Sequence, residues 1–363
     1  MRVGISLLTL SPADSGGSEV YARGLVRALA AEGSHEYAVF VPTRSQDAAD
    51  GLPAVAVREL PVARRGPPRI PALALAALGS RSLRARLRTL DLLHYALTVP
   101  LPRAPVPTAV TLHDLQHRDL PSFFGRGRRA FRRLAYDRAA REAAAVIVPT
   151  AFVRARALDL LGLDPARVHI VPLAVDRALF RPGEEQREPF LLYPARPWPH
   201  KNHARLLAAF TLLRREHPEL RLVLTGVGLE RLGPLPEGVE RRGAVSPDEL
   251  ASLYRRAACL VFPSLYEGFG LPPLEAMACG CPVAAANTAA IPEVCGDAAV
   301  LFDPNDPAAI AAGVLEAVGR ASELHERGLA RAARFTWSAA ARSHDAAYES
   351  ALSGARAGTP TTT

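Results

Sequence analysis

The sequence is almost devoid of lysine. Of the 44 lysine and arginine side chains in 363 residues, 43 are arginine, and the single lysine, Lys201, lies in the stretch ARPWPHKN (195–202). This exception is informative because lysine is a compact point charge that fits beside one phosphate oxygen, whereas arginine is a wide planar fork. Two interpretations of Lys201 stay open on composition alone: a phosphate ligand and a solvated surface charge.

Cysteine and long apolar runs are also scarce. The four cysteines include no C-x-x-C pair, which disfavours a disulfide framework and a zinc site; they are Cys259, Cys279, Cys281 and Cys295. No apolar run approaches the roughly 18 residues that a membrane-spanning helix requires. The apolar stretch of the amino-terminal MRVGISLLTLSPA is short for a secretion signal, and we interpret it as a buried first strand. We therefore expect a cytoplasmic globular protein.

The excess of positive charge is concentrated in the first half of the chain. The net charge is +8, and residues 1–182 carry 26 basic and 15 acidic side chains, whereas the remainder carries 18 and 21. Much of the excess lies in RSLRARLRTL (81–90) and GRGRRAFRRLAYDRAAR (125–141). Aromatic residues near these stretches are too few for base stacking, so we expect no nucleic-acid partner. Solvated helix faces and peripheral contact with an anionic membrane remain as interpretations.

Short runs rich in Val, Ile and Leu alternate with helical stretches, which predicts parallel sheets covered by helices. In the first half the runs are 2–8, 37–42, 54–60, 91–97, 108–115, 144–150 and 168–175. After the polar segment 181–189 they are 190–195, 220–226, 239–245, 258–264, 281–287 and 298–304. The restart predicts two tandem Rossmann-like, doubly wound α/β domains. The expected ranges are 1–182, 183–336, a closing helix at 337–355 that crosses back to the first domain, and a disordered tail at 356–363.

Polar or glycine-rich stretches follow five of the predicted strands. In doubly wound sheets, ligands bind beyond the carboxyl ends of the strands. The five stretches are Gly16 with Gly17, His113 with Asp114, ARPWPHKN, Gly226 with Gly228, and SLYEGFG (264–270). If the two domains face each other, all five line one cleft.

The stretch SLYEGFGLPPLEAMACGCPV (264–283) carries two carboxylates at a fixed spacing. Glu267 lies in a glycine-flanked turn, and Glu275 follows eight residues later, beyond two prolines that suit the first turn of a helix. Two such acceptors could hold hydroxyls at two points along a bound nucleotide sugar. The preference of helix N-termini for acidic residues would explain one glutamate but not the EGFG turn.

Two other kinds of site fit the sequence poorly. The glycines of TGVGLERLG do not have the G-x-G-x-x-G spacing of a nicotinamide-dependent oxidoreductase; they are Gly226, Gly228 and Gly233. Two closely spaced histidine pairs straddle strand ends or proline-bounded loops rather than one helix face, so we expect polar cleft residues and no metal; they are His113 with His117 and His200 with His203.

Taken together, these stretches resemble the retaining nucleotide-sugar glycosyltransferases of family 4, which have the two-domain GT-B fold. Glu267 through Glu275 resembles the family's paired-glutamate signature, and ARPWPHKN resembles its Arg and Lys motif. Further similar stretches are SGGSEVYARGLVRALA (15–30), TLHDLQHRDLPSFF (111–124), IPEVCGDAAVLFDPND (291–306) and FTWSAAARSHDAAY (335–348). The resemblance covers nearly the whole chain and is strongest to bacterial mannosyltransferases that build surface polysaccharides. One departure is AAIPEV (289–294), where many relatives have Gly-Gly-Pro-Glu.

The resemblance implies roles for individual residues. Lys201 and Arg196 would bind the donor diphosphate, and Lys201 would meet the charge that grows on the leaving phosphate. Glu267 would contact the donor sugar, and His113 would lie near sugar and acceptor without acting as a base. Glu275 would bind the ribose. The other implied donor-binding residues are Gly17, Gly226, Val245, Gly268, Phe269, Gly270 and Leu271.

The implied activity is transfer of a hexose, with retention of configuration, from a nucleoside-diphosphate sugar. The first domain would bind the acceptor, a hydroxyl of a glycan, of a lipid-linked molecule or of a small molecule, and the second would bind the donor. Mannose, and hence GDP-mannose, is favoured, and no metal or other cofactor is expected. The alternatives are a sugar-nucleotide epimerase of the same fold and a non-catalytic protein that binds anionic surfaces.

Overall fold

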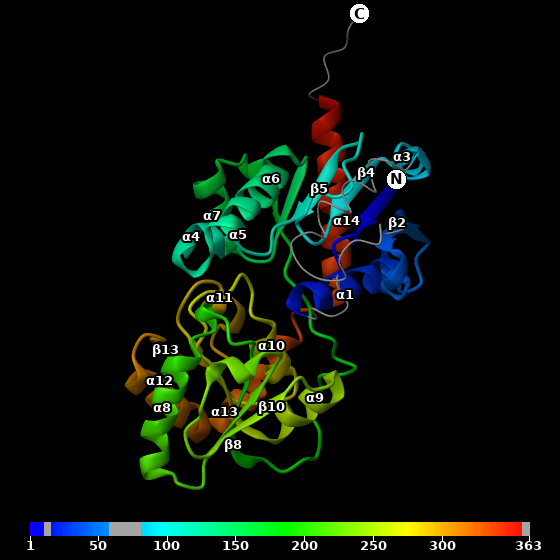
Figure 1. Cartoon of the computed structure of the whole chain (residues 1–363). Coiled ribbons are helices and arrows are strands. Elements are labelled where there is room, and N and C mark those ends of the chain that lie inside the picture. Colours follow the sequence, from blue (N-terminus) through cyan, green and yellow to red (C-terminus); the bar gives the residue numbers. More distant parts are fainter. Residues whose placement is uncertain (11–15, 58–80, 358–363) are drawn as a thin grey trace, which may run out of the picture. The chain divides into compact units, whose positions relative to one another are not determined.

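The computed structural model describes residues 1–10, 16–57 and 81–357, and these form two compact units. The first unit contains Met1–Ala174 together with the carboxyl-terminal segment that begins at Trp337, and the second is Val175–Thr336 (Figure 1). The predicted strand residues 58–60 and the tail residues 358–363 lie outside the described part of the chain.

The first unit is built on a seven-stranded parallel sheet in the order β3-β2-β1-β4-β5-β6-β7. The strands are β1 (Arg2–Ser6), β2 (Glu36–Pro42), β3 (Ala54–Val57), β4 (Leu92–Tyr95), β5 (Thr108–Thr111), β6 (Ala145–Val148) and β7 (Val168–Ile170). Each coincides with one of the predicted apolar runs, which confirms the predicted fold class here. The order of the strands reverses between β1 and β4.

The second unit repeats the design with a six-stranded parallel sheet in the order β10-β9-β8-β11-β12-β13. Its strands are β8 (Glu188–Pro194), β9 (Arg221–Thr225), β10 (Val239–Gly243), β11 (Ala257–Phe262), β12 (Val283–Ala286) and β13 (Val300–Phe302). The order reverses between β8 and β11. This is the topological switch point, where the connections leave to opposite sides and a ligand can enter.

Helices cover both sheets. In the first unit they are α1 (Gly17–Glu32), α3 (Arg81–Leu87), α4 (Gln116–Asp119), α5 (Arg126–Arg132), α6 (Arg138–Glu142), α7 (Ala151–Leu161) and α14 (Trp337–Ala357). In the second they are α8 (His203–Glu216), α9 (Pro247–Arg256), α10 (Leu271–Ala278), α11 (Ile291–Cys295), α12 (Pro307–Gly319) and α13 (Ala321–Ala332). The short 3-10 or π turns are η1 (Thr43–Ala49), η2 (Pro121–Phe123), η3 (Arg133–Asp137), η4 (Pro165–Arg167), η5 (Pro199–Lys201) and η6 (Leu229–Leu232).

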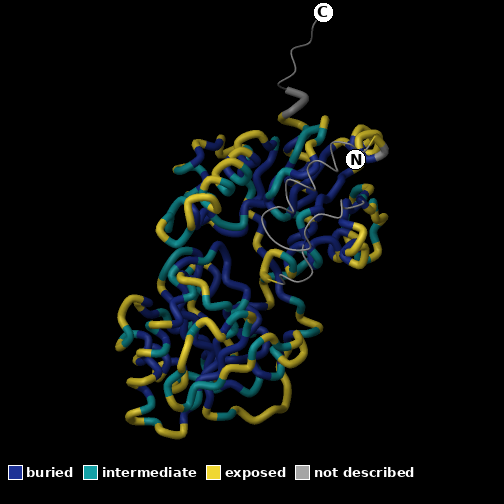
Figure 2. Tube along the Cα trace, in the orientation of Figure 1, coloured by how far each residue is buried: buried dark blue, intermediate teal, exposed yellow. Residues whose placement is uncertain are grey.

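The central strands of each sheet are deeply buried, whereas the edge strands β3, β7 and β10 are partly exposed; Figure 2 colours the buried residues dark blue. Strands β4, β6 and β12 are buried at every position and β11 at every position but Ala258, as expected of parallel strands covered on both faces. No helix within the described ranges is both long and apolar enough to cross a membrane.

The closing helix α14 completes the first unit. It packs against α1, β5 and β6. At Gly24 of α1 the approach is so close that a Cβ atom would lie 2.0 Å from the ring of Trp337. A residue with any side chain at position 24 would therefore push α14 away from α1.

Candidate active site

In the second unit, two predicted catalytic residues meet across the topological switch point. Lys201 follows β8 and Glu267 follows β11, the two strands between which the order reverses. The Lys201 Nζ lies 2.5 Å from Glu267 Oε1, and the two side chains are only 15% and 16% exposed. Such a pair carries a desolvation cost that its own attraction offsets only partly. An anion that entered beside Lys201 would compete with Glu267 for the ammonium group.

The loop that carries Lys201 is fixed by Asn202, a residue that the sequence analysis did not single out. Asn202 has left-handed backbone angles, with φ of 61°, which asparagine tolerates better than most residues. Its buried amide Nδ2 donates to the carbonyl oxygens of Pro263 at 3.1 Å and Pro304 at 2.7 Å, just after β11 and β13. The Tyr193 hydroxyl also donates to the Lys201 carbonyl oxygen at 2.6 Å. These contacts hold the loop against the carboxyl edge of the sheet.

Arg196 begins the same loop. Its guanidinium carbon lies 5.6 Å from the centre of the Trp198 ring, within the range of a cation–π contact. Arg196 and Lys201 are therefore carried by one short segment after β8, but they contact different neighbours. Lys201 forms an ion pair with Glu267, and the Arg196 guanidinium lies over the Trp198 ring.

Glycine at position 226 permits a close approach of two loops. Gly226 follows β9 with φ of 133°, and its backbone N–H donates to the Gly243 carbonyl oxygen at 2.6 Å. A Cβ atom there would lie 2.9 Å from the Ala195 carbonyl oxygen. Val245 follows β10 and is half-buried. Both predicted donor-binding residues thus lie at the same edge of the sheet as Lys201.

The paired-glutamate stretch forms a turn and a helix, as predicted. Gly270, with φ of 109°, caps α10, and prolines occupy its first turn. The segment before α10, Gly268 to Gly270, is buried. The first N–H groups of a helix lack partners within it, and together with the helix dipole they favour a negative charge. The start of α10 is therefore suited to bind a phosphate.

Glu275 is buried on α10. It accepts a hydrogen bond from the Tyr254 hydroxyl of α9 at 3.0 Å. Burial raises its pKa from 4.5 to about 7, although the hydrogen bond from Tyr254 opposes the shift. The carboxyl group therefore changes its charge close to neutral pH.

Gly17 and His113 lie in the first unit, at the carboxyl ends of β1 and β5. Gly17 is the first residue of α1. The His113 Nε2 lies 3.1 Å from the Ala96 carbonyl oxygen, and its ring packs edge-on against Tyr21 with centroids 4.9 Å apart. Burial lowers the pKa of His113, which favours the neutral ring. Since a carbonyl oxygen only accepts, Nε2 carries the hydrogen and Nδ1 keeps a lone pair for a hydroxyl donor.

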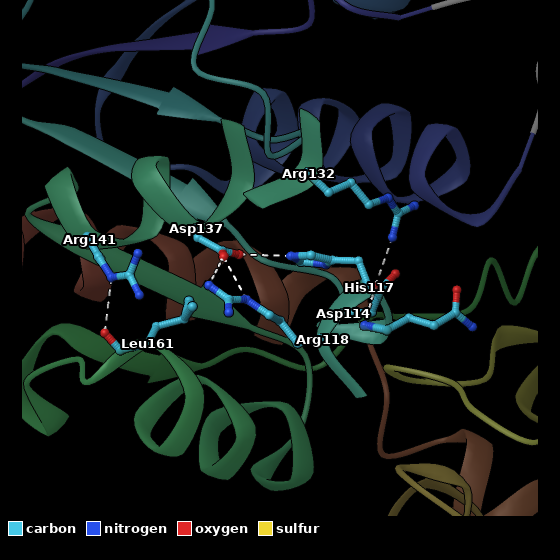
Figure 3. Close-up of polar contacts among 8 residues, drawn as sticks. Asp114, His117, Arg118, Arg132, Asp137, Arg141 and Leu161 are labelled. Atoms are coloured by element: carbon cyan, nitrogen blue, oxygen red, sulfur yellow. Dashed lines mark hydrogen bonds and ion pairs between the residues drawn. The ribbon is translucent and has the colours of Figure 1, made fainter. Parts of the chain in front are cut away.

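The segment after His113 is held by a buried carboxylate. Asp137 Oδ1 lies 2.8 Å from His117 Nε2, and Asp137 Oδ2 accepts from both Arg118 Nε, at 2.8 Å, and Arg118 Nη2 (Figure 3). These partners hold the pKa of Asp137 below its usual value against the effect of burial. His117 is thus a fully buried structural partner and not a cleft residue.

Arg132 is engaged in the same region. Its Nη1 lies 3.3 Å from Asp114 Oδ1, and its guanidinium carbon lies 4.8 Å from the centre of the Phe124 ring and 5.2 Å from that of Tyr136. Figure 3 shows the side chain directed at Asp114. Within the arginine-rich stretch, Arg132 thus contacts other side chains of the first unit, whereas Arg126, Arg128 and Arg133 are exposed.

The second histidine pair is also used in packing. His203 is buried against Tyr193, with ring centroids 4.9 Å apart, and burial lowers its pKa to about 4. The carbonyl oxygen of the buried His200 accepts a hydrogen bond from the Leu265 N–H at 2.7 Å. Over residues 1–10, 16–57 and 81–357, no three His, Cys, Asp or Glu side chains group as a metal site would require.

The glycines after β9 also fail to form a dinucleotide-binding turn. Gly228 caps the four-residue turn η6, and no long helix begins there. A Rossmann fingerprint needs the N-terminus of the crossover helix at this point to hold a pyrophosphate. The oxidoreductase interpretation therefore finds no support in the local structure.

Two family models match the chain in succession. The model described as Glycosyltransferase Family 4 matches residues 15–179, and the model described as Glycosyl transferases group 1 matches residues 175–328. The first range includes Gly17 and His113. The second includes Arg196, Lys201 and both glutamates of the paired-glutamate stretch.

Curated relatives include two mannosyltransferases. O-antigen chain mannosyltransferase B of Escherichia coli is 30% identical over 271 residues, which cover 68% of this chain and 71% of that protein. MMP alpha-(1->4)-mannosyltransferase of Mycolicibacterium hassiacum is 35% identical over 219 residues, 54% of this chain and 53% of that protein. D-inositol 3-phosphate glycosyltransferase of Segniliparus rotundus is 35% identical over 219 residues, 53% of this chain and 49% of that protein. The matches thus span about half the length of the last two relatives.

Solved structures share the architecture. Sucrose-phosphate synthase of Thermosynechococcus elongatus superposes with a TM-score of 0.79 at 21% identity, over 98% of this chain and all (100%) of that chain. HepE of Anabaena, solved with UDP and glucose, gives a TM-score of 0.69 at 16% identity, over 99% and 100% of the two chains. At these identities the likeness shows the fold, which is GT-B. The matched models and the Escherichia coli relative place this chain among the family 4 glycosyltransferases, and within that family it is similar to bacterial mannosyltransferases.

Proposed function

We propose that the chain transfers a hexose from a nucleoside-diphosphate sugar to an acceptor hydroxyl, with retention of the anomeric configuration and without a metal ion. The observation that carries the proposal is the Lys201–Glu267 pair at the topological switch point. The loop with Arg196 and the start of α10 lie at the same edge of the sheet. This arrangement offers two cations and a helix N-terminus to a diphosphate, and carboxylates to hydroxyls.

The proposed step breaks the bond between the sugar C1 and the diphosphate oxygen. The acceptor oxygen bonds to C1 on the face that the diphosphate leaves, and the acceptor proton passes to the departing phosphate oxygen. Lys201 and Arg196 stabilise the negative charge that grows on this phosphate. Glu267, which holds Lys201 in the free protein, then accepts hydrogen bonds from the sugar.

The position of the other predicted donor-binding residues at the carboxyl edge of the sheet supports a role for each. We assign Glu275 to the ribose hydroxyls, the N–H groups of Gly268 to Leu271 to the phosphate, and Gly226 and Val245 to the loops beside the nucleotide. In the first unit, Gly17 begins a helix whose N-terminus suits an anion, and the Nδ1 lone pair of His113 suits an acceptor or sugar hydroxyl.

GDP-mannose is the donor we favour, since several relatives are named mannosyltransferases. The acceptor we propose is a hydroxyl of a glycan, of a lipid-linked molecule or of a small molecule. A thermal-shift series with GDP-, UDP-, dTDP- and ADP-sugars identifies the donor, because a ligand at a hundred times its Kd adds about 2.7 kcal/mol of stability. A chain that none of these sugars stabilises would contradict the proposed donor class.

The transfer itself is tested by measuring nucleoside diphosphate release and the glycosylated product with Lys201→Ala. The matched control is Arg221→Ala, which removes a cation of the same unit at the start of β9, where Arg221 pairs with Glu188 at 2.9 Å. We expect the first variant to lose nearly all transfer and the second to keep it. Consumption of donor with release of a different free sugar, and no glycosylated product, would instead support the epimerase.

We also propose that the first unit binds anionic membrane at the cytoplasmic face. The supporting observation is two groups of exposed arginines, one in and just after α3 and one around α5, where Leu134 is also 68% exposed. The arginines are Arg81, Arg84, Arg86, Arg88, Arg126, Arg128 and Arg133. Each basic residue near an anionic surface contributes about 1 kcal/mol, and an apolar side chain among them can enter the headgroup region.

Co-sedimentation with vesicles of neutral and acidic lipid tests the membrane proposal. The variant changes Arg126, Arg128 and Arg133 to Gln and leaves Arg132, which is engaged with Asp114. The control removes three exposed arginines from the second unit: Arg215, Arg231 and Arg334. We expect salt-sensitive binding that only the first variant loses. Equal sedimentation of the two variants would leave the arginines as a solvated face.

A further inference from the structure

A buried chain of hydrogen bonds lies directly beneath His113 in the first unit. The Tyr21 hydroxyl of α1 lies 2.8 Å from Thr111 Oγ1, at the end of β5, and 2.8 Å from His344 Nε2 of α14. The same Thr111 Oγ1 lies 2.8 Å from His94 Nε2 of β4, and His94 Nδ1 lies 2.9 Å from the Tyr348 hydroxyl. All five side chains are buried.

The direction of every bond in this chain follows from one backbone carbonyl. His344 Nδ1 lies 2.7 Å from the Ala340 carbonyl oxygen, which can only accept, so Nδ1 carries the hydrogen. Burial lowers the pKa of His344 to about 4, so its ring is neutral at pH 7 and Nε2 must accept. The Tyr21 hydroxyl therefore donates to His344.

The remaining bonds are then fixed in turn. Because the one hydrogen of Tyr21 is used, its oxygen accepts from Thr111, and the Thr111 oxygen accepts from His94 Nε2. Burial lowers the pKa of His94 well below its usual value, so this ring is also neutral and its Nδ1 accepts from Tyr348. Every donor in the hydrogen-bond chain has an acceptor. If one residue exchanged its donor and acceptor roles while the others kept theirs, a buried polar group would be left unpaired.

The hydrogen-bond chain reaches His113 through Tyr21 and Thr111. The rings of Tyr21 and His113 pack in a T-shaped arrangement, and Thr111, at the end of β5, is two residues before His113. The Thr111 carbonyl oxygen accepts from Thr98 Oγ1 at 2.6 Å, two residues after Ala96, whose carbonyl holds His113 Nε2. The Ala96 carbonyl and the Tyr21 ring both contact His113, and both belong to segments that the hydrogen-bond chain connects.

We propose that Tyr21 is a positioning residue for His113, and that through its hydroxyl the closing helix α14 sets the orientation of the His113 ring. The expected effect on kcat rests on the proposed function, whereas the expected effect on the orientation of the His113 ring does not. Tyr21→Phe keeps the aromatic ring against His113 and removes only the hydrogen bonds to His344 and Thr111. A displacement of about 1 Å at a reacting group can reduce kcat about a hundredfold.

Tyr37→Phe is the matched control. The Tyr37 hydroxyl also anchors α14, because it donates its one hydrogen to Asp345, and it therefore donates to no member of the chain beneath His113. Each variant removes one hydroxyl that holds α14. We expect Tyr21→Phe to lower kcat by about tenfold to a hundredfold with an unchanged KM for the donor, and Tyr37→Phe to keep the wild-type kcat. Equal kcat values for the two variants would overturn the proposal.

Imidazole nitrogen NMR tests the same proposal without turnover. In the wild-type chain we expect His344 as the Nδ1–H tautomer and His94 and His113 as Nε2–H tautomers. The His113 nitrogen signals should shift in Tyr21→Phe and not in Tyr37→Phe. Opposite tautomers, or a shift of equal size in both variants, would overturn the proposal. An inactive wild type with the expected spectra would contradict the proposed function and leave the positioning chain intact.

Discussion

Replacing Glu275 by Gln should make the second unit more stable at pH 8. The carboxyl group is buried on α10, and its pKa rises from 4.5 in the unfolded chain to about 7 in the folded protein. Each pH unit between these values corresponds to 1.36 kcal/mol, so the buried carboxylate costs about 3 kcal/mol above pH 7. Gln has nearly the same shape and can still accept the hydrogen bond from Tyr254.

The sign of the pH dependence follows from which state binds more protons. Between pH 4.5 and about 7 the folded protein keeps a proton on Glu275 that the unfolded chain has lost. The stabilising effect of this raised pKa is complete below pH 4.5 and disappears as the pH rises through 7. The difference in unfolding free energy between Glu275→Gln and the wild type should therefore be near zero at pH 4.5 and largest at pH 8.

Urea denaturation at several pH values measures this difference, and hydrogen–deuterium exchange of β8 and β11 assigns it to the second unit. Glu326→Gln, the same change at an exposed position of α13, is the control for the loss of one charge. A difference that does not vary with pH would refute the reasoning. If Glu275 binds the ribose, Glu275→Gln should also weaken donor binding by about tenfold, because a hydrogen bond to a charged group is stronger than one to a neutral group.

Three further predictions concern the proposed reaction. Lys201→Ala should lower kcat by at least about a hundredfold. Lys201→Arg should also turn over slowly, because a planar guanidinium does not replace a point charge beside Glu267. Wild-type turnover of the arginine variant would contradict the proposed role of the lysine. Activity should survive EDTA, and a loss that manganese or magnesium restores would reject a reaction without metal. Proton NMR of the first product should show the anomeric configuration of the donor, and an inverted anomer would reject retention.

The sequence predicted the sheets because parallel strands buried on both faces are short, continuous apolar runs. Every run, from RVGISLL to AAVLFDP, coincides with a strand in the described part of the chain. The carboxyl-end stretches were predictable for the same reason, since a polar stretch after a buried strand must lie at the edge of the sheet. The EGFG turn and the prolines of α10 gave correct local signals as well.

Contacts between distant residues could not be predicted in this way. Lys201 and Glu267 are 66 residues apart, and no periodicity pairs them. Asn202 could have been identified as a left-handed cap, since it follows a proline-bounded turn and precedes a helix. His94 in DLLHYAL and His344 in the alanine-rich last helix could have been noted as polar rings on apolar faces, but their partners are visible only in three dimensions.

The closing helix also determines the order in which the chain can fold during synthesis. The first unit is discontinuous, because Tyr21 reaches its partner His344 only 323 residues later, whereas Val175–Thr336 is continuous. Domains usually fold in the order in which they leave the ribosome. Here the later unit can fold while the earlier one still lacks the helix that covers α1, β5 and β6. The first unit therefore keeps an apolar surface uncovered until α14 has been translated, and this surface is the part of the unit that a chaperone would have to protect.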